Sequence, residues 1–204
     1  AMDDDDIRHN QPTSHKVFGE AQAILSGDGL QALAFQVICN DSLLHDETKV
    51  KLLSLLSESS YKMAEGQSID LSIVSQKVDI DFLNEMHQKK TGALLSCAIN
   101  FGAILNDTSD KDLSVLEVFS NKIGLAYQVQ DDVLDVTTSD DILGKRQNSD
   151  STKNKPSYPS IIGIDESIKI FKELYQGALD ELSLLSVDAK PLRKMTRELM
   201  SRSY

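Results

Sequence analysis

The stretch LAYQVQDDVLDV, residues 125–136, closes a long amphipathic segment, 113–135, and decides how the rest of the chain is interpreted. Apolar residues of this segment recur every three or four positions, the spacing of one face of an α-helix. The same periodicity predicts helices at 28–39, 46–64, 82–86, 92–104, 165–185 and 188–200. Strand-like alternation is nearly absent, so the chain is predicted to be all-α.

Several details of this helical plan are specific enough to test. Gly66 is expected to interrupt the helix that starts at residue 46. The nearly all-apolar stretch 92–104 is expected to form a central helix buried on most sides. Another helix is predicted at 17–25, and Asp165 is expected to cap the helix that it opens. The polar stretch 137–158 is predicted to be a loop, either a functional one or a disordered surface insertion.

Composition limits the class of protein. The chain has 204 residues, of which 40% are hydrophobic and 26% charged, which is typical of a single soluble domain spanning residues 1–204. A net charge of −11 without a Lys/Arg-rich run argues against a nucleic-acid partner. We find no apolar run long enough for a membrane span and no signal-peptide pattern. Cys39 and Cys97 are predicted to be buried reduced thiols, which favours a cytoplasmic protein.

The negative charge is concentrated in two clusters, residues 3–6 and the trio Asp131, Asp132 and Asp135. On a helix, Asp131 and Asp135 lie one turn apart, with Gln128 beside the same edge. Two carboxylates at this spacing can share Mg²⁺, which leaves its other positions to water and substrate phosphate. The alternative for the trio is a solvated helix end, which the negative end of the helix dipole disfavours. For residues 3–6 the alternative is a solvated tail.

Basic residues near these clusters suggest a phosphate ligand. Lys90, Thr91 and Gly92 stand at the junction of two helical stretches, while Lys145 and Lys155 lie on the polar loop. Taken alone, each lysine is more often an exposed surface charge. Combined with carboxylates and Mg²⁺, lysines can bind a diphosphate and stabilise it as a leaving group. No HExxH, Cys/His metal spacing, GxSxG or phosphate-loop motif is present, which disfavours zinc enzymes, serine hydrolases and nucleotide-binding folds.

These motifs resemble those of the trans-polyprenyl diphosphate synthase family, most closely the bacterial farnesyl (short-chain) type. The matching segments cover nearly the whole chain: MDDDDIR (2–8), QPTSHKVFGEA (11–21), LQALAF (30–35), MAEGQSIDL (63–71), MHQKKTGALL (86–95), LAYQVQDDVLDV (125–136), LGKRQNSD (143–150) and KPSYPS (155–160). The resemblance implies an all-α isoprenoid-synthase-type bundle with a deep central cavity, generally a homodimer. It implies Mg²⁺-assisted ionisation of an allylic diphosphate, followed by head-to-tail attack of isopentenyl diphosphate, to give a short-chain product such as geranyl or farnesyl diphosphate.

The resemblance also implies roles for individual residues. The family's Mg²⁺ ligands correspond to Asp3, Asp131 and Asp135. Asp132 would support these ligands, and Asp150 would lie in their outer shell. The allylic diphosphate would be held by Arg8, Lys90, Lys145 and Lys155. Thr91 and Gln128 would line the cavity near the reacting carbon, and both are catalytic candidates together with Lys90. Gln67 and Asp70 fall in the GQxxD segment and would help to orient basic side chains.

Three departures from the family pattern affect this expectation. The chain starts inside the first aspartate-rich motif, DDxxxxD, so only Asp3 is present, and the preceding helices with their isopentenyl diphosphate ligands are absent. His9 stands where the family has a second arginine, and a neutral imidazole cannot supply a permanent bidentate charge. Asn148 replaces a common glycine. The parent enzyme is expected to be a synthase, and this fragment alone is expected to be inactive.

Two alternatives remain at this point. The protein could be a non-catalytic regulatory subunit of a prenyl synthase, although the complete second aspartate motif argues against a decayed site. It could also be a terpene cyclase, which shares the fold and ionisation chemistry but needs only one diphosphate. The apolar stretches 28–39 and 92–104 are candidate dimer surfaces.

Overall fold

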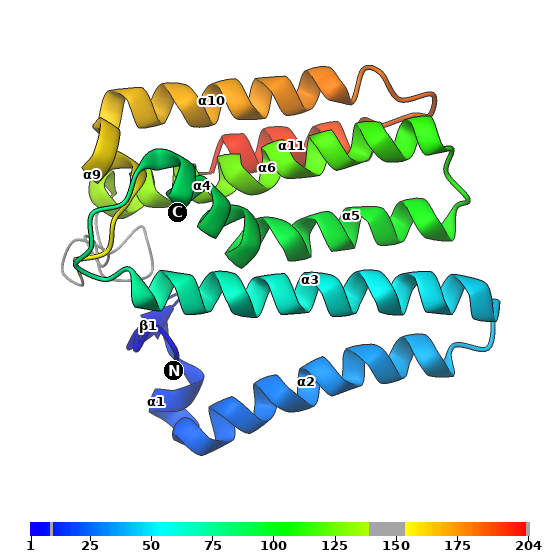
Figure 1. The fold of residues 1–204 in the computed structure, drawn as a ribbon, viewed down its shortest axis with the longest axis horizontal. Helices are drawn as coiled ribbons and strands as arrows, with labels where there is room; N and C mark the ends of the chain where they lie inside the picture. The colour runs from blue at the N-terminus through cyan, green and yellow to red at the C-terminus, as the bar shows by residue number, and fades with distance from the viewer. Residues whose placement is uncertain (9, 139–153, 203–204) are drawn as a thin grey trace.

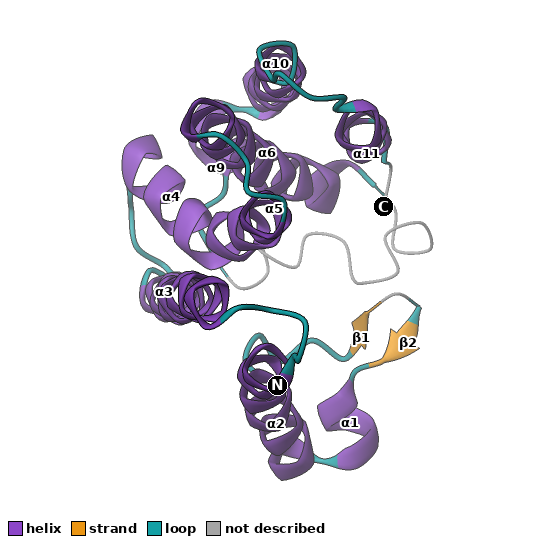
Figure 2. Ribbon diagram, turned by 90° about the vertical axis from the view of Figure 1, so that its right-hand side faces the viewer, coloured by secondary structure: helices purple, strands orange, loops and turns teal. Residues whose placement is uncertain are grey.

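The computed structural model describes residues 1–8, 10–138 and 154–202 and confirms the all-α prediction. Long helices lie side by side with a short hairpin near the N-terminus (Figure 1). The elements are β1 (Ile7–Arg8), β2 (Gln11–Pro12), α1 (Ser14–Phe18), α2 (Glu20–Asn40), α3 (Asp46–Ser72), α4 (Ile80–His87), η1 (Gln88–Gly92), α5 (Ala93–Leu105), α6 (Asp110–Thr137), α9 (Tyr158–Ile162), α10 (Ile164–Glu181) and α11 (Lys190–Met200). Turned by 90°, α3 lies between α2 and α5, and α1 and the hairpin lie on the same side as α2 (Figure 2).

The core is centred on α6 and α10, and buried residues of α4, α5 and α9 also belong to it. The predicted helical periodicity places one stripe of each helix in this core, including Phe119, Ile123 and Ala126 of α6 and Phe171 and Tyr175 of α10. Phe119 and Tyr175 have no exposed surface. Burying a large apolar side chain contributes roughly 1.5–3 kcal/mol, so this interface supplies much of the stability of the bundle.

The predicted interruption at Gly66 is wrong, because α3 continues through it to Ser72. Gly66 serves close packing instead: a Cβ there would lie 2.2 Å from the backbone nitrogen of Lys90. On the far side of η1, a Cβ at Gly124 of α6 would lie 2.7 Å from the Cα of Gly92. Two glycines therefore allow α3 and α6 to contact the backbone of η1, a π-helical turn, from both sides.

Other local expectations are also corrected. The helix predicted at 17–25 is broken at Gly19, whose φ of +87° ends α1 and precedes α2. Asp165 lies in the first turn of α10, while Gly163 occupies the cap position. The hairpin was not expected because strands of two residues show no alternation. Cys97 is buried as predicted, whereas Cys39 is exposed.

The expectation that 92–104 is buried on most sides is wrong for α5. Of its side chains only Cys97 and Ala103 are buried, and Leu94 and Leu105 are exposed. One face of α5 lines an apolar groove of about 920 Å³ together with α6 and α11. Apolar composition thus identified the helix but could not tell which of its faces is covered.

Helix α2 presents apolar side chains to the solvent. Leu30, Leu33 and Val37 are 67%, 48% and 61% exposed, in the stretch predicted to form a dimer surface. None of the described helices combines the length and apolar character needed to cross a bilayer. Most of the predicted polar loop, 139–153, lies outside the described residues.

Candidate active site

A cavity of about 240 Å³ gathers many of the candidate residues at one end of the bundle. The N-terminal segment, α3, the α4–η1 junction, α6 and the segment before α9 all contribute to its wall. The lining residues are Asp3, Asp5, Arg8, Asp70, Met86, His87, Lys90, Thr91, Tyr127, Gln128, Asp131, Asp132, Lys155 and Pro156. Residues up to 152 positions apart in the chain therefore meet here, as between Asp3 and Lys155.

An ion network forms one wall of the cavity. Oδ2 of Asp70 accepts hydrogen bonds from Nζ of Lys90 at 2.8 Å and from Nζ of Lys155 at 2.6 Å. The Lys155 ammonium also donates to Oδ1 of Asp3 at 3.1 Å, and Gln67 Nε2 donates to the same oxygen at 3.2 Å. The GQxxD segment thus contacts both lysines and Asp3, which agrees with its expected supporting role.

This network keeps Asp3 and Lys155 ionised. Burial opposes the charge on Asp3, but Lys90 and Lys155 outweigh it and lower the pKa of Asp3 to about 2. Burial likewise opposes the charge on Lys155, but the hydrogen bond and charge of Asp70 raise its pKa above the ordinary value. At neutral pH the cavity therefore holds an ammonium and a carboxylate in contact, both charged.

Thr91 and Gln128 meet across the cavity. The Thr91 hydroxyl donates to Oε1 of Gln128 at 2.9 Å, and Gln128 Nε2 donates to Oδ1 of Asp132 at 3.4 Å. Since the Thr91 hydroxyl proton is directed at Gln128, oxygen lone pairs are what Thr91 can offer to a ligand. Such lone pairs suit an electron-poor carbon.

The three aspartates on α6 have different environments. The Asp131 side chain is 36% exposed and contacts the cavity. Asp132 is only 3% exposed; its Oδ2 accepts from the backbone N–H of Tyr158 at 3.0 Å and lies 3.4 Å from Nε2 of His87. Asp135 is 1% exposed and is not among the described residues that line the cavity. Asp131 is therefore the member of the trio best placed to meet a ligand.

The C-terminal part of the chain contacts Asp131, a contact that the sequence did not reveal. The Arg202 guanidinium lies 3.8 Å from the ring centroid of Tyr127 and donates to the Tyr127 carbonyl at 3.1 Å and to Oδ1 of Asp131 at 3.4 Å. Gln130 Nε2 donates to the carbonyls of Met200 and Arg202, both at 3.2 Å. Helix α6 thereby holds Arg202 against the site.

The site also contains residues that the sequence analysis did not predict: His87, Tyr127, Tyr158 and Arg202. His87 stacks against Tyr158 at 6.0 Å between centroids, and both surround Asp132. The segments MHQKKTG and KPSYPS carry two of these residues, and LAYQVQDD carries Tyr127, so a signal was present in three cases. Arg202 had none, since a lone arginine carries no motif.

Burial of Tyr158 gives a pH-dependent prediction. Burial, followed by the charges of Asp132 and Asp81, raises the pKa of the Tyr158 hydroxyl from 10.0 to about 12. Between these values only the unfolded chain loses the proton, so the free energy of unfolding is expected to fall as pH rises. Urea denaturation from about pH 8 to about pH 11 should show the decline, and Tyr158→Phe should reduce it. An equal decline in this variant would contradict the assignment.

The cavity carries oxygen donors of the kind that Mg²⁺ binds. Within the described parts of the chain, no three His, Cys, Asp or Glu side chains gather as a ready metal site. Mg²⁺ does not need such a cage, since one or two carboxylates plus substrate phosphates and water complete its octahedron. The cavity lining supplies hard carboxylate oxygens from Asp3 and Asp131. These residues fit a Mg²⁺ that a diphosphate brings with it.

Not every predicted residue can be placed. Lys145, Asn148 and Asp150 lie outside the described residues, as does His9. Arg8, on β1, is exposed and lines the cavity, as its predicted contact with a diphosphate requires.

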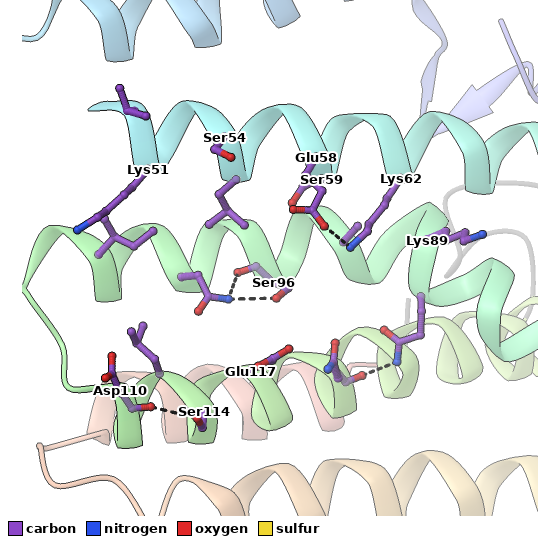
Figure 3. A pocket seen from close by; sticks show the side chains of 18 of the residues that line it. Lys51, Ser54, Glu58, Ser59, Lys62, Lys89, Ser96, Asp110, Ser114 and Glu117 are labelled. Carbon is purple, nitrogen blue, oxygen red and sulfur yellow. Dashed lines mark hydrogen bonds and ion pairs between the residues drawn. The ribbon is translucent and has the colours of Figure 1, made fainter. Parts of the chain in front are cut away.

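A larger hollow, about 1050 Å³, lies elsewhere, between α3, α5 and α6 (Figure 3). Its charged side chains include Lys62, which pairs with Glu58 at 2.7 Å, and Lys89, which pairs with Glu85 at 2.8 Å. None of the predicted site residues within 1–8, 10–138 and 154–202 lines it. We therefore assign the chemistry to the smaller cavity, where charges from distant parts of the chain converge.

Comparisons with known proteins agree with the motifs. Residues 1–184 match the model of the family described as Polyprenyl synthetase. Farnesyl diphosphate synthase of Escherichia coli is 38% identical over 100% of this chain and 71% of its own length. For farnesyl diphosphate synthase of Bacillus subtilis the identity is 40%, over 90% of this chain and 66% of the relative. The crystal structure of geranyltransferase from Helicobacter pylori complexed with magnesium and isoprenyl diphosphate superposes with a TM-score of 0.84 at 29% identity, covering 97% of this chain and 65% of that one.

Proposed function

Because the chain belongs to the polyprenyl synthetase family, we propose that the protein is a prenyltransferase that condenses an allylic diphosphate with isopentenyl diphosphate, head to tail. The chain spans 71% of the Escherichia coli relative and 66% of the Bacillus subtilis relative. The proposed activity is therefore that of the whole protein to which this chain belongs. The observation that supports it best is the convergence of Lys90, Lys155, Asp3 and Asp131 on one cavity.

In this proposal the residues divide the work between binding and ionisation. Lys90 and Lys155, with Arg8, hold the allylic diphosphate through charge-assisted hydrogen bonds. Asp3 and Asp131 would hold Mg²⁺, which, when bound, neutralises the negative charge that develops on the leaving diphosphate. Lys145, Asp132, Asp135 and Asp150 complete the proposed diphosphate and metal sites.

The carbon end of the substrate is assigned to Thr91 and Gln128. Their oxygens are joined by the 2.9 Å hydrogen bond from the Thr91 hydroxyl, and both residues line the cavity. Fixed oxygen dipoles next to the ionising carbon stabilise the positive charge that develops there. Attack by isopentenyl diphosphate and loss of a proton then complete the condensation.

Finer features of the proposal follow the family resemblance. We assign a short-chain product, geranyl or farnesyl diphosphate, one domain over residues 1–204, a cytoplasmic location and a homodimer. The exposed apolar side chains Leu30, Leu33 and Val37 of α2 support the homodimer, because contiguous apolar surface of this kind marks interfaces.

A product assay tests the proposal. The protein is incubated with Mg²⁺, labelled isopentenyl diphosphate and dimethylallyl or geranyl diphosphate, and prenyl products are extracted. Label transfer that requires both substrates and Mg²⁺ is expected of the longer parent enzyme, whereas the 204-residue chain alone is expected to give none. Release of a hydrocarbon from farnesyl diphosphate alone would identify a cyclase instead. Activity that appears only after a longer homologous chain is added would identify a regulatory subunit.

A further inference from the structure

The ion network alternates in charge along its length: Asp3, Lys155, Asp70 and Lys90 form a chain in which each contacts the next. In the part of the chain that the structure describes, two ammonium groups thus alternate with two carboxylates. Such a network has little attraction for another anion, because each lysine already has a carboxylate at hydrogen-bond distance. Binding of a diphosphate here must therefore change at least one of these contacts.

The two partners of Lys155 are not equivalent. Asp70 is on α3, its side chain is 8% exposed, and its oxygen lies 2.6 Å from the Lys155 nitrogen. Asp3 precedes the hairpin, its side chain is 29% exposed, and the distance is 3.1 Å. Removing one partner from a buried pair leaves a buried charge uncompensated, whereas a more exposed pair is readily replaced by solvent or another ion.

We propose that Lys155 keeps Asp70 as a permanent partner and exchanges Asp3 for the diphosphate. Asp3 thus occupies the diphosphate position of Lys155 until a divalent cation draws the carboxylate away. The cation and the diphosphate then promote each other's binding, because the cation draws Asp3 away from Lys155 and Lys155 can then bind the diphosphate. This inference rests on the proposed function, in which Lys155 binds the diphosphate and Asp3 a divalent cation.

Binding of inorganic pyrophosphate without divalent cations, in EDTA, tests the exchange by calorimetry. Asp3→Asn removes the competing charge, so it is expected to tighten pyrophosphate binding about tenfold, equivalent to about 1.4 kcal/mol. Asp4→Asn is the matched control: it changes net charge equally one residue away, but Asp4 pairs with Lys16 at 3.3 Å rather than with Lys155. This control is expected to stay within about twofold of the unchanged protein.

A third variant shows whether the gain acts through Lys155. Adding Lys155→Met to Asp3→Asn should abolish the tighter binding. Equal affinities for Asp3→Asn and the unchanged protein, or equal gains in Asp3→Asn and Asp4→Asn, would overturn the exchange. If the unchanged protein still binds pyrophosphate in Mg²⁺, the proposed function survives that result. Absence of pyrophosphate binding in every variant, with and without Mg²⁺, would overturn both.

Discussion

Gly66→Ala is expected to lower the free energy of unfolding by about 3 kcal/mol, because the added methyl group would overlap the backbone of η1. The Cβ position lies 2.2 Å from the nitrogen and 2.6 Å from the Cα of Lys90. Backbone atoms cannot rotate aside as a side chain can, so α3 and η1 would have to separate. Because Lys90 belongs to the cavity, pyrophosphate binding should weaken together with stability.

Gly102→Ala supplies the matched control for this variant. Gly102 also lies inside a helix, α5, but nothing stands within 4 Å of its Cβ position. Alanine there should raise the free energy of unfolding by roughly 0.5–1 kcal/mol through its higher helix propensity. Urea denaturation of both variants checks the pair. Similar free energies of unfolding for the two variants would show that the space between α3 and η1 can accommodate a methyl group at residue 66.

Asp131→Asn is expected to weaken Mg²⁺-dependent pyrophosphate binding about 100-fold, or about 2.7 kcal/mol. Asparagine keeps the shape of the side chain but removes the negative charge that Mg²⁺ requires from its protein ligands. Stability should change little, because Asp131 is partly exposed and its contact with Arg202 is 3.4 Å long. Calorimetric titration of pyrophosphate in excess Mg²⁺ measures the effect.

Asp180→Asn is a suitable comparison for Asp131→Asn. Asp180 is exposed on α10, where its carboxylate accepts from Gln176 at 2.8 Å, and it does not line the cavity. The two variants have the same net charge, so a loss confined to Asp131→Asn reports the site rather than the overall field. Undiminished binding in Asp131→Asn would remove Asp131 from the proposed metal ligands.

The sequence could predict those features that depend on periodicity and on motifs. The stripe that includes Phe119 and Ile123 follows directly from helical spacing, as does its partner stripe on α10. The sequence places Lys90 and Thr91 at the junction of two helical stretches and predicts that they act together with the carboxylates; the structure brings them to the same cavity as Asp3.

Features that depend on contacts between distant segments could not be predicted in this way. Gly66 reads locally as a helix breaker, and only the approach of Lys90 shows why a glycine is needed there. Arg202 belongs to no motif, yet the buried Gln130 amide brings it to Asp131. The apolar composition of α5 likewise does not say which neighbour covers it. In each case the decisive partner is far away in the chain.

The glycine contacts on both sides of η1 have a mechanical consequence. At Gly66 and Gly124 the backbones of α3 and α6 contact the backbone of η1 directly. No side chain at these contacts can rotate to allow one helix to shift against another, so α3, η1 and α6 form a rigid frame. Lys90 and Thr91 belong to η1 and so to this frame, whereas Asp3 and Lys155 lie in segments outside it. Movement during ligand exchange should therefore be confined to Asp3, since Lys155 is held on α3 by its contact with Asp70.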